Sequence, residues 1–310
     1  MRIAIIGQAP FGAAVYEKLR ENGHEIVGVF TPPEREGGRP DALADAARRD
    51  NATLIQPRRW QRKGEIDEEV VAQYEATKPD LNVMAFVTQI IPQRVLDFPA
   101  QDTIQYHPSL LPKHRGRSAI NHALLEGDAE TGLTIFWVDA GLDTGPILLQ
   151  KSFPIAENDT VNSLYRDHLF PLGVDALTES VELVATGDAP RIAQNEDDAS
   201  YEGPWEKDIA RIDWSRSAAD VHNFIRGSDR QPGAWTTLNG APVKLYGSSA
   251  AGADAGAAGS VAAVSDSGVV VRCGDGEAIQ VDTAQADGGK RVPAHEWAAE
   301  AKVESGAQFE

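Results

Sequence analysis

His107 and Asp143 are the residues with which this chain could do acid–base chemistry. His107 closes a short apolar run and is followed by Pro108, so it should lie in extended backbone at a strand end. Asp143 lies in a glycine-rich turn after another apolar run. A carboxylate near an imidazole raises the pKa of the imidazole, which favours a proton donor close to neutral pH. We therefore expect His107 and Asp143 to form a catalytic pair.

Gln105 extends this pair, because it has the same strand parity as His107 and both side chains can face one side of a sheet. A carboxamide beside an imidazolium suits an oxyanion that forms at a carbonyl carbon. The predicted chemistry is therefore attack of a nucleophile on such a carbon, with Gln105 assisting the pair.

The elements that must position these residues alternate between strand and helix in the first half of the chain. Such alternation predicts an α/β fold, a Rossmann-like parallel sheet with helices on both faces, which places its ligands where strands end. The expected strands are 2–6, 25–30, 53–55, 81–86, 104–106 and 134–138, and the expected helices are 13–22, 41–49, 67–76 and 118–125.

The second half predicts a different architecture. A helical stretch at 159–185, interrupted by Pro171, completes a catalytic domain at 1–188, and a segment rich in Asp, Asn, Pro and Gly at 189–205 is interpreted as a linker. Residues 206–310 should form a small, mostly β domain, an open barrel of the OB-like type. Within it we expect a hairpin around Asn239–Gly240 and a flexible Ser/Ala/Gly loop at 248–259.

Composition and charge restrict the class of protein. The chain has 310 residues and a net charge of -18, which argues against broad binding to DNA or to an anionic membrane. The first residues read as a strand and not as a signal peptide, and no apolar run is long enough to span a bilayer. Cys273 is the single cysteine, which excludes an internal disulfide and favours a cytoplasmic location.

The glycine-rich turn at 7–12 does not predict a nucleotide site. It lacks the G-x-G-x-x-G spacing, no acidic residue follows the second strand, and the lysine of a phosphate-binding loop is missing. We therefore expect neither NAD(P) nor ATP, and no metal.

Two motifs identify a family. The chain resembles the formyltransferases and hydrolases that use 10-formyltetrahydrofolate over nearly its whole length, through the runs 107–112, 115–116 and 141–145. Within the family it is most similar to the hydrolase domain of 10-formyltetrahydrofolate dehydrogenases, through segments such as 6–8 and 222–227. Methionyl-tRNA formyltransferases share the two core motifs and the two-domain layout.

The resemblance implies roles for individual residues. His107 and Asp143 match the catalytic pair, while Gln105 departs from the asparagine of the transferases and from the apolar residue of the dehydrogenases. The implied folate contacts are Phe86, Val87, Thr88, Gln89, Ile90 and Ile91 around the pterin, Ser109, Leu110, Leu111 and Pro112 on one loop, and Asp139, Ala140 and Gly141 on another.

The implied activity is removal of the formyl group from 10-formyltetrahydrofolate, which acts as donor substrate. The acceptor stays open between water, initiator methionyl-tRNA and an amino-sugar nucleotide, and a non-catalytic folate-binding protein is a further alternative. The loop at 31–40 is short and nearly balanced in charge, where methionyl-tRNA formyltransferases carry a longer basic insertion. The acidity of the chain also weakens binding to phosphates.

Three side features have alternative interpretations. The basic residues Lys113, His114, Arg115 and Arg117 could hold an anion beside the pocket or form a solvated patch. Trp60 could stack on a nucleotide but should more often pack in a core, and Cys273 is expected to be structural.

Overall fold

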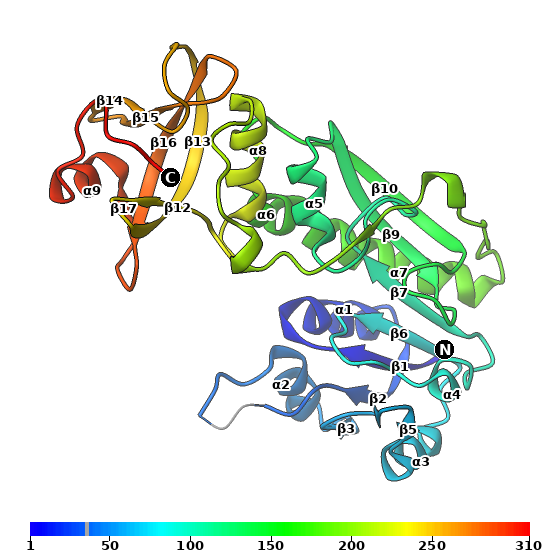
Figure 1. Cartoon of the computed structure of the whole chain (residues 1–310). Helices are drawn as coiled ribbons and strands as arrows, with labels where there is room; N and C mark the ends of the chain where they lie inside the picture. Colours follow the sequence, from blue (N-terminus) through cyan, green and yellow to red (C-terminus); the bar gives the residue numbers. More distant parts are fainter. Residues whose placement is uncertain (35–36) are drawn as a thin grey trace. The chain divides into compact units, whose positions relative to one another are not determined.

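The apolar runs of the first half become strands of one seven-stranded sheet in the computed structural model, which describes residues 1–34 and 37–310 (Figure 1). The predicted α/β fold is confirmed. The strand order is β10-β9-β7-β6-β1-β2-β3. The strands are β1 (Arg2–Gly7), β2 (Glu25–Phe30), β3 (Leu54–Ile55), β6 (Leu81–Ala85), β7 (Thr103–His107), β9 (Glu130–Trp137) and β10 (Ile147–Pro154), with a small separate pair, β4 (Gln61–Arg62) and β5 (Glu65–Ile66).

Strand direction divides this sheet into two parts. β1 pairs in parallel with β2 and β6, β6 pairs in parallel with β7, and β2 with β3. β9, however, runs antiparallel to β7, with Ile104 opposite Trp137 and His107 opposite Thr134. The predicted parallel order therefore ends at β7. The carboxyl ends of β1, β6 and β7 share one edge of the sheet, where α/β folds place ligands.

Aspartate side chains cap the starts of α2 and α3. The Asp41 side chain accepts hydrogen bonds from the backbone N–H groups of Leu43 and Ala44, and Asp67 accepts one from Val70. Pro171 lies just after the π-helical turn Leu164–Leu169, so the expected interruption coincides with a break in the regular α-helical hydrogen bonding. The helices of the first two-thirds are α1 (Ala9–Glu21), α2 (Ala42–Arg49), α3 (Glu68–Ala76), α4 (Gln93–Leu96), α5 (Ala119–Leu125), α6 (Val161–Ser163), a π-helix (Leu164–Leu169) and α7 (Phe170–Thr186).

Trp60 belongs to the core beside the sheet. It is 1% exposed, and its ring lies 5.4 Å from that of Phe30 and 5.9 Å from that of Tyr74. The packing interpretation of Trp60 holds, and this ring has no free face for a nucleotide base.

The C-terminal part is mostly β, as predicted. Its sheet has the order β12-β13-β16-β15-β14, with β17 also paired to β16. The predicted hairpin joins β12 and β13 through Asn239 and Gly240, whose positive φ angles of 51° and 77° suit a two-residue turn. The elements of this part are the 3-10 turns Glu196–Asp198 and Lys207–Ile209, β11 (Tyr201–Glu202), α8 (Ala218–Ser228), β12 (Ala234–Leu238), β13 (Ala241–Ala253), β14 (Val261–Ser265), β15 (Gly268–Arg272), β16 (Glu277–Ala286), β17 (Val292–Pro293) and α9 (Ala294–Glu300). The short strand β8 (Arg115–Gly116) comes earlier in the chain, between β7 and α5.

One prediction for this part is wrong. The first half of the expected flexible loop at 248–259 continues β13 to Ala253 and pairs with β16, with Ser248 opposite Val281 and Ala250 opposite Ile279. Ser, Ala and Gly offer the same backbone N–H and C=O groups as larger residues. Their composition suggested a loop because the partner strand lies far along the chain.

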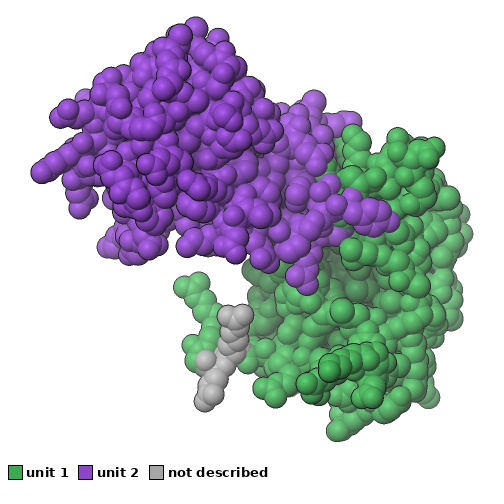
Figure 2. All heavy atoms as spheres, in the orientation of Figure 1, with its two compact units in different colours: residues 1–115, 132–152, 168–200 green, residues 116–131, 153–167, 201–310 purple. Residues whose placement is uncertain are grey.

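The chain divides into two compact units (Figure 2). Unit 1 comprises residues 1–115, 132–152 and 168–200, and unit 2 comprises residues 116–131, 153–167 and 201–310. All residues predicted for the catalytic and folate sites fall in unit 1. The predicted domain boundaries at 188 and 205 stay a prediction. Among the described residues, no helix combines the length and apolarity needed to cross a membrane.

Candidate active site

His107 ends β7 and is buried, with 5% of its surface exposed. Its Nε2 lies 2.8 Å from the backbone carbonyl oxygen of His114. Because a carbonyl oxygen only accepts, Nε2 must carry the hydrogen of this bond. Nδ1 is then the atom that faces the carboxylate of Asp143, at 3.6 Å from Oδ2.

Asp143 lies in a tight loop between β9 and β10. Its φ of 56° is left-handed, and the side chain is 7% exposed. Inside the loop, Asp139 Oδ1 accepts hydrogen bonds from the Gly141 N–H at 3.0 Å and the Thr144 hydroxyl at 2.7 Å. A Cβ at Gly145 would lie 1.7 Å from the Trp137 carbonyl oxygen, so only glycine permits this close approach. The carboxylate of Asp143 is therefore presented by a rigid turn.

The route by which Asp143 reaches His107 differs from the expected one. In the expected parallel sheet the strands before His107 and Asp143 would end at the same edge, but β9 ends beside the start of β7, where the Val138 N–H donates to the Thr103 carbonyl. The loop must return along the sheet to place the carboxylate beside His107. Periodicity in one sequence does not encode strand direction, which is why the prediction missed this return.

Gln105 joins the pair. Its Nε2 donates to Asp143 Oδ1 at 3.3 Å, and its side chain is half-buried. An amide nitrogen carries two hydrogens, so Gln105 can bind Asp143 with one and present the other to a substrate oxygen. The structure thus brings Gln105, His107 and Asp143 together.

Burial corrects the expected electrostatics of His107. The loss of solvent lowers the pKa of its imidazole below the ordinary value of 6.5, and the opposing effects of the Asp143 carboxylate and the His114 carbonyl do not compensate. The expected rise in pKa is wrong, because the sequence showed the carboxylate but not the burial. His107 is neutral at pH 7, with its hydrogen on Nε2.

The Ser109–Pro112 loop is hydrogen-bonded by two residues of β9 and β10 that the sequence analysis did not predict as part of the site. The Thr134 hydroxyl donates to the Ser109 carbonyl at 2.7 Å and accepts from the Leu111 N–H at 3.1 Å. Gln150 Nε2 donates to the Leu111 carbonyl at 2.8 Å. Thr134 stands opposite His107 in the β7–β9 ladder, a pairing that local pattern does not reveal.

Within that loop the side chains differ in direction. Ser109 and Leu111 are buried, and the Ser109 hydroxyl donates to the Lys113 carbonyl at 2.7 Å. Leu110 and Pro112 are half-buried. A ligand against this loop would therefore meet Leu110, Pro112 and backbone groups.

The segment 86–91 follows β6 at the same edge of the sheet as His107. Phe86 is 48% exposed and Ile90 is 77% exposed, and Leu142 on the Asp143 loop is 60% exposed. Large apolar side chains left in water mark a surface suited to an apolar or aromatic ligand. A hollow next to this segment is lined by Ile6, Gly7, Phe30, Pro32, Phe86, Val87, Thr88 and Gln89.

The basic residues at 113–117 form neither an anion-binding site nor a solvated patch as a group. Arg115 is fully buried and forms a bidentate ion pair with Glu196, at 2.9 and 2.7 Å, while His114 is 3% exposed. Only Lys113 and Arg117 face water. Ser118 precedes α5 with a φ of 62°, and its side chain does not cap the helix. Arg115 is thus a structural cation and not an anion seat.

The predicted structural role of Cys273 agrees with its position in the core of unit 2. The thiol is 2% exposed, and burial raises its pKa to about 12. It stays protonated at neutral pH and is a poor nucleophile.

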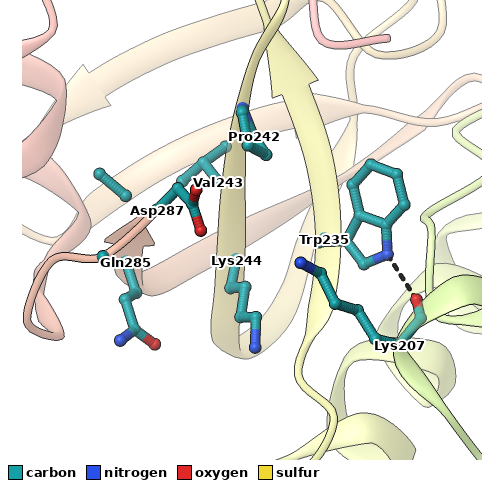
Figure 3. A pocket seen from close by; sticks show the side chains of 9 residues that line it. Lys207, Trp235, Pro242, Val243, Lys244, Gln285 and Asp287 are labelled. Carbon is teal, nitrogen blue, oxygen red and sulfur yellow. Dashed lines mark hydrogen bonds between the residues drawn. The ribbon is translucent and has the colours of Figure 1, made fainter.

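A pocket in unit 2 lies apart from these residues in the sequence. Trp235, Lys244 and Lys207 line it, and Trp235 Nε1 donates to the Lys207 carbonyl at 2.8 Å (Figure 3). None of the predicted catalytic or folate-contacting residues is among those that line it.

Sequence comparison identifies the family to which these residues belong. The family model described as formyl transferase matches residues 1–177, and the model of its C-terminal domain matches residues 205–302. Mitochondrial 10-formyltetrahydrofolate dehydrogenase of Homo sapiens is 44% identical over 305 residues, covering 96% of this chain and 33% of that protein. The chain thus spans about a third of the dehydrogenases it matches.

Two further proteins are similar over most of their own length. Methionyl-tRNA formyltransferase of Trichlorobacter lovleyi is 37% identical over 298 residues, which are 94% of this chain and 92% of that protein. The crystal structure of WlaRD, a sugar 3N-formyl transferase, superposes with a TM-score of 0.69 at 21% identity, covering 91% of this chain and 97% of that one. At this identity the superposition shows a shared fold.

Proposed function

Because the chain belongs to the formyl transferase family, we propose that it takes the formyl group from N10 of 10-formyltetrahydrofolate and passes it to water or an amine. The observation that carries the proposal is the buried cluster of His107, Asp143 and Gln105 at the end of β7. The exposed apolar side chains of Phe86, Ile90 and Leu142 give the folate rings a surface beside it.

In the proposed reaction, a nucleophile attacks the formyl carbon and the carbonyl oxygen becomes an oxyanion. The N–H of Gln105 that does not bind Asp143 donates to this oxyanion, which the contact of the other N–H with Asp143 supports. The proton of the nucleophile passes to Asp143 or to Nδ1 of the neutral His107. The bond from the formyl carbon to N10 then breaks, and this proton returns to N10. Folate is a substrate here, and the chain's own groups carry the protons.

Water is the acceptor that the observations favour. The net charge of -18 opposes binding of a polyanion, and the matched dehydrogenases are more similar in sequence than the tRNA enzyme. The loop at 31–40, which bears on tRNA binding, includes residues 35–36, which lie outside the described residues.

Reduced, buried Cys273 fits a reaction in the cytoplasm.

A second candidate is transfer to the amine of initiator methionyl-tRNA. It is supported by 37% identity to a methionyl-tRNA formyltransferase over 92% of that protein. Transfer to an amino-sugar nucleotide has only the shared fold in its favour.

The test is to follow the spectral change from 10-formyltetrahydrofolate to tetrahydrofolate, first without an acceptor and then with charged initiator tRNA. We expect turnover without an acceptor, with formate as the product. Turnover that requires charged tRNA would show a transferase instead. Folate binding without turnover under either condition would show a non-catalytic binding protein and overturn the proposal.

A further inference from the structure

The side chain of Gln194 lies between a buried arginine and the loop that carries Asp143. Its Oε1 accepts from Arg115 Nε at 3.0 Å and from Arg115 Nη2 at 2.7 Å. Its Nε2 donates to the backbone carbonyls of Asp143 at 2.9 Å and Gly145 at 2.7 Å. One carboxamide therefore joins the guanidinium to both sides of the turn that presents the carboxylate.

Arg115 is itself held in place. Its side chain is fully buried, and Glu196 binds it through two parallel hydrogen bonds of 2.9 and 2.7 Å. Arg–carboxylate pairs of this bidentate kind restrict direction as well as distance. The residue before it, His114, gives its carbonyl to His107 Nε2 at 2.8 Å. Two adjacent residues thus bind the two parts of the site, His114 through its carbonyl and Arg115 through its guanidinium.

We infer that Gln194 is a positioning residue, which together with Arg115 holds the Asp143 carboxylate at its distance from His107. The three residues Gln194, Arg115 and Glu196 are called the Gln194 clamp below. The catalytic consequence of the clamp rests on the proposed function, whereas the clamp as a restraint on the Asp143 loop does not.

The Asp143 loop needs a restraint of this kind. A φ of 56° is uncommon for a residue with a side chain, and such conformations persist where the surroundings impose them. The carbonyls of Asp143 and Gly145 both accept from one amide group, so loss of the amide removes a restraint at two positions of the turn. A displacement of about 1 Å in a catalytic group can lower the rate about a hundredfold.

Hydrogen exchange tests the clamp without any turnover. Gln194→Met keeps the length of the side chain and removes its hydrogen bonds. Gln285→Met is the matched control, because Gln285 is also half-buried, accepts from the Tyr246 hydroxyl at 3.0 Å and donates to the Gly289 carbonyl at 2.8 Å in unit 2. We expect amide exchange at 139–145 to become about tenfold faster in Gln194→Met and to stay unchanged in Gln285→Met. Unchanged exchange at 139–145 in Gln194→Met would overturn the inference.

Kinetics test the catalytic consequence. We expect Gln194→Met to lower kcat for formyl release about ten- to a hundredfold, with KM for 10-formyltetrahydrofolate within about twofold of wild type. Gln194→Glu keeps an oxygen for Arg115 and so keeps the melting temperature, but its second oxygen faces two carbonyls. It should lose kcat as Gln194→Met does. A general structural role predicts the reverse, with kcat following the melting temperature across the variants.

The outcomes separate the two claims. If wild type does not turn over 10-formyltetrahydrofolate, the proposed function fails, and hydrogen exchange alone decides on the clamp. If wild type is active and both Gln194 variants keep the kcat of Gln285→Met, the proposed function stands and the positioning role is wrong.

Discussion

The burial of His107 determines what the catalytic cluster can do. A charged imidazole next to a carboxylate would be an acid, but the lowered pKa of His107 favours its neutral form, which in the proposed reaction accepts a proton. The hydrogen on Nε2 is engaged by the His114 carbonyl, so Nδ1 and the Asp143 carboxylate form the proton-accepting side of the site. In the proposed reaction the oxyanion donor is therefore Gln105 and not His107.

The lowered pKa of His107 predicts how stability depends on pH. The unfolded chain protonates this histidine near pH 6.5, whereas the folded protein resists the proton. As pH falls through 6.5 the unfolded state therefore binds more protons, and the free energy of unfolding decreases. Urea unfolding of wild type and His107→Gln at several pH values should show a decrease below pH 6.5 that is larger in wild type. A wild-type curve that gains stability in this range relative to the variant would contradict the account.

Two substitutions of Gln105 separate the presence of its amide from the reach of its side chain. Gln105→Leu removes the amide that we propose as the oxyanion donor, and removing one such donor lowers kcat about a hundred- to a thousandfold. Gln105→Asn keeps the amide but shortens its reach by one methylene, so its kcat should lie between those of Gln105→Leu and wild type. Steady-state kinetics with 10-formyltetrahydrofolate measure both, and circular dichroism controls for folding. Wild-type kcat in Gln105→Leu would exclude the oxyanion role.

Strand β9 holds the Ser109–Pro112 loop through the side chain of Thr134. The Thr134 hydroxyl hydrogen-bonds both the Ser109 carbonyl and the Leu111 N–H, so this strand residue fixes the position of the Ser109–Pro112 loop relative to the sheet. The loop is thus part of the sheet's hydrogen-bonded structure and not a free surface segment.

Thr134→Val tests this support. The change keeps the shape but leaves the buried Leu111 N–H without its acceptor, which should lower the free energy of unfolding by about 1–3 kcal/mol. The displaced loop should raise KM for 10-formyltetrahydrofolate more than it lowers kcat. Thr178→Val is the control, because Thr178 is also buried but donates only to the Val174 carbonyl within α7. Equal KM values in the two variants would show that Thr134 does not shape the folate loop.

The sequence predicted the elements whose information is local. Apolar runs located β1 and β6, the Asn239–Gly240 pair located a hairpin, and Asp41 marked a helix start. Its failures concern long-range pairing, such as the antiparallel direction of β9 and the continuation of β13 through Ala253.

The candidate site shows the same division. Short motifs marked His107 and Asp143, which the structure places side by side. Gln194 and Glu196 were missed because they lie in the segment interpreted as a linker, and their partner Arg115 lies 79 and 81 residues earlier. Nothing in the composition of that segment indicates a contact over such a distance.

At the scale of the whole molecule, net charge bears on the acceptor. A chain with a charge of -18 repels nucleic acid unless a local basic surface compensates. Arg115, the centre of the basic cluster in the sequence, is buried against Glu196 and so does not supply such a surface.

Competition by deacylated tRNA tests whether the protein has a surface that binds nucleic acid. At about 50 mM salt, where electrostatic binding to phosphates is strong, an excess of deacylated tRNA should change the rate of formyl release by less than about twofold. Inhibition that disappears with added salt would reveal a nucleic-acid surface and favour the tRNA acceptor.

The rate of formyl release by Asp143→Asn shows whether the Asp143 carboxylate takes a proton during the reaction. Asparagine tolerates the left-handed backbone at this position and can still accept from Gln105, but it cannot take a proton. We predict a kcat lowered about a hundred- to ten-thousandfold, the usual contribution of a general base, with folate affinity within about threefold of wild type. Turnover near the wild-type rate in a folded Asp143→Asn protein would contradict the account.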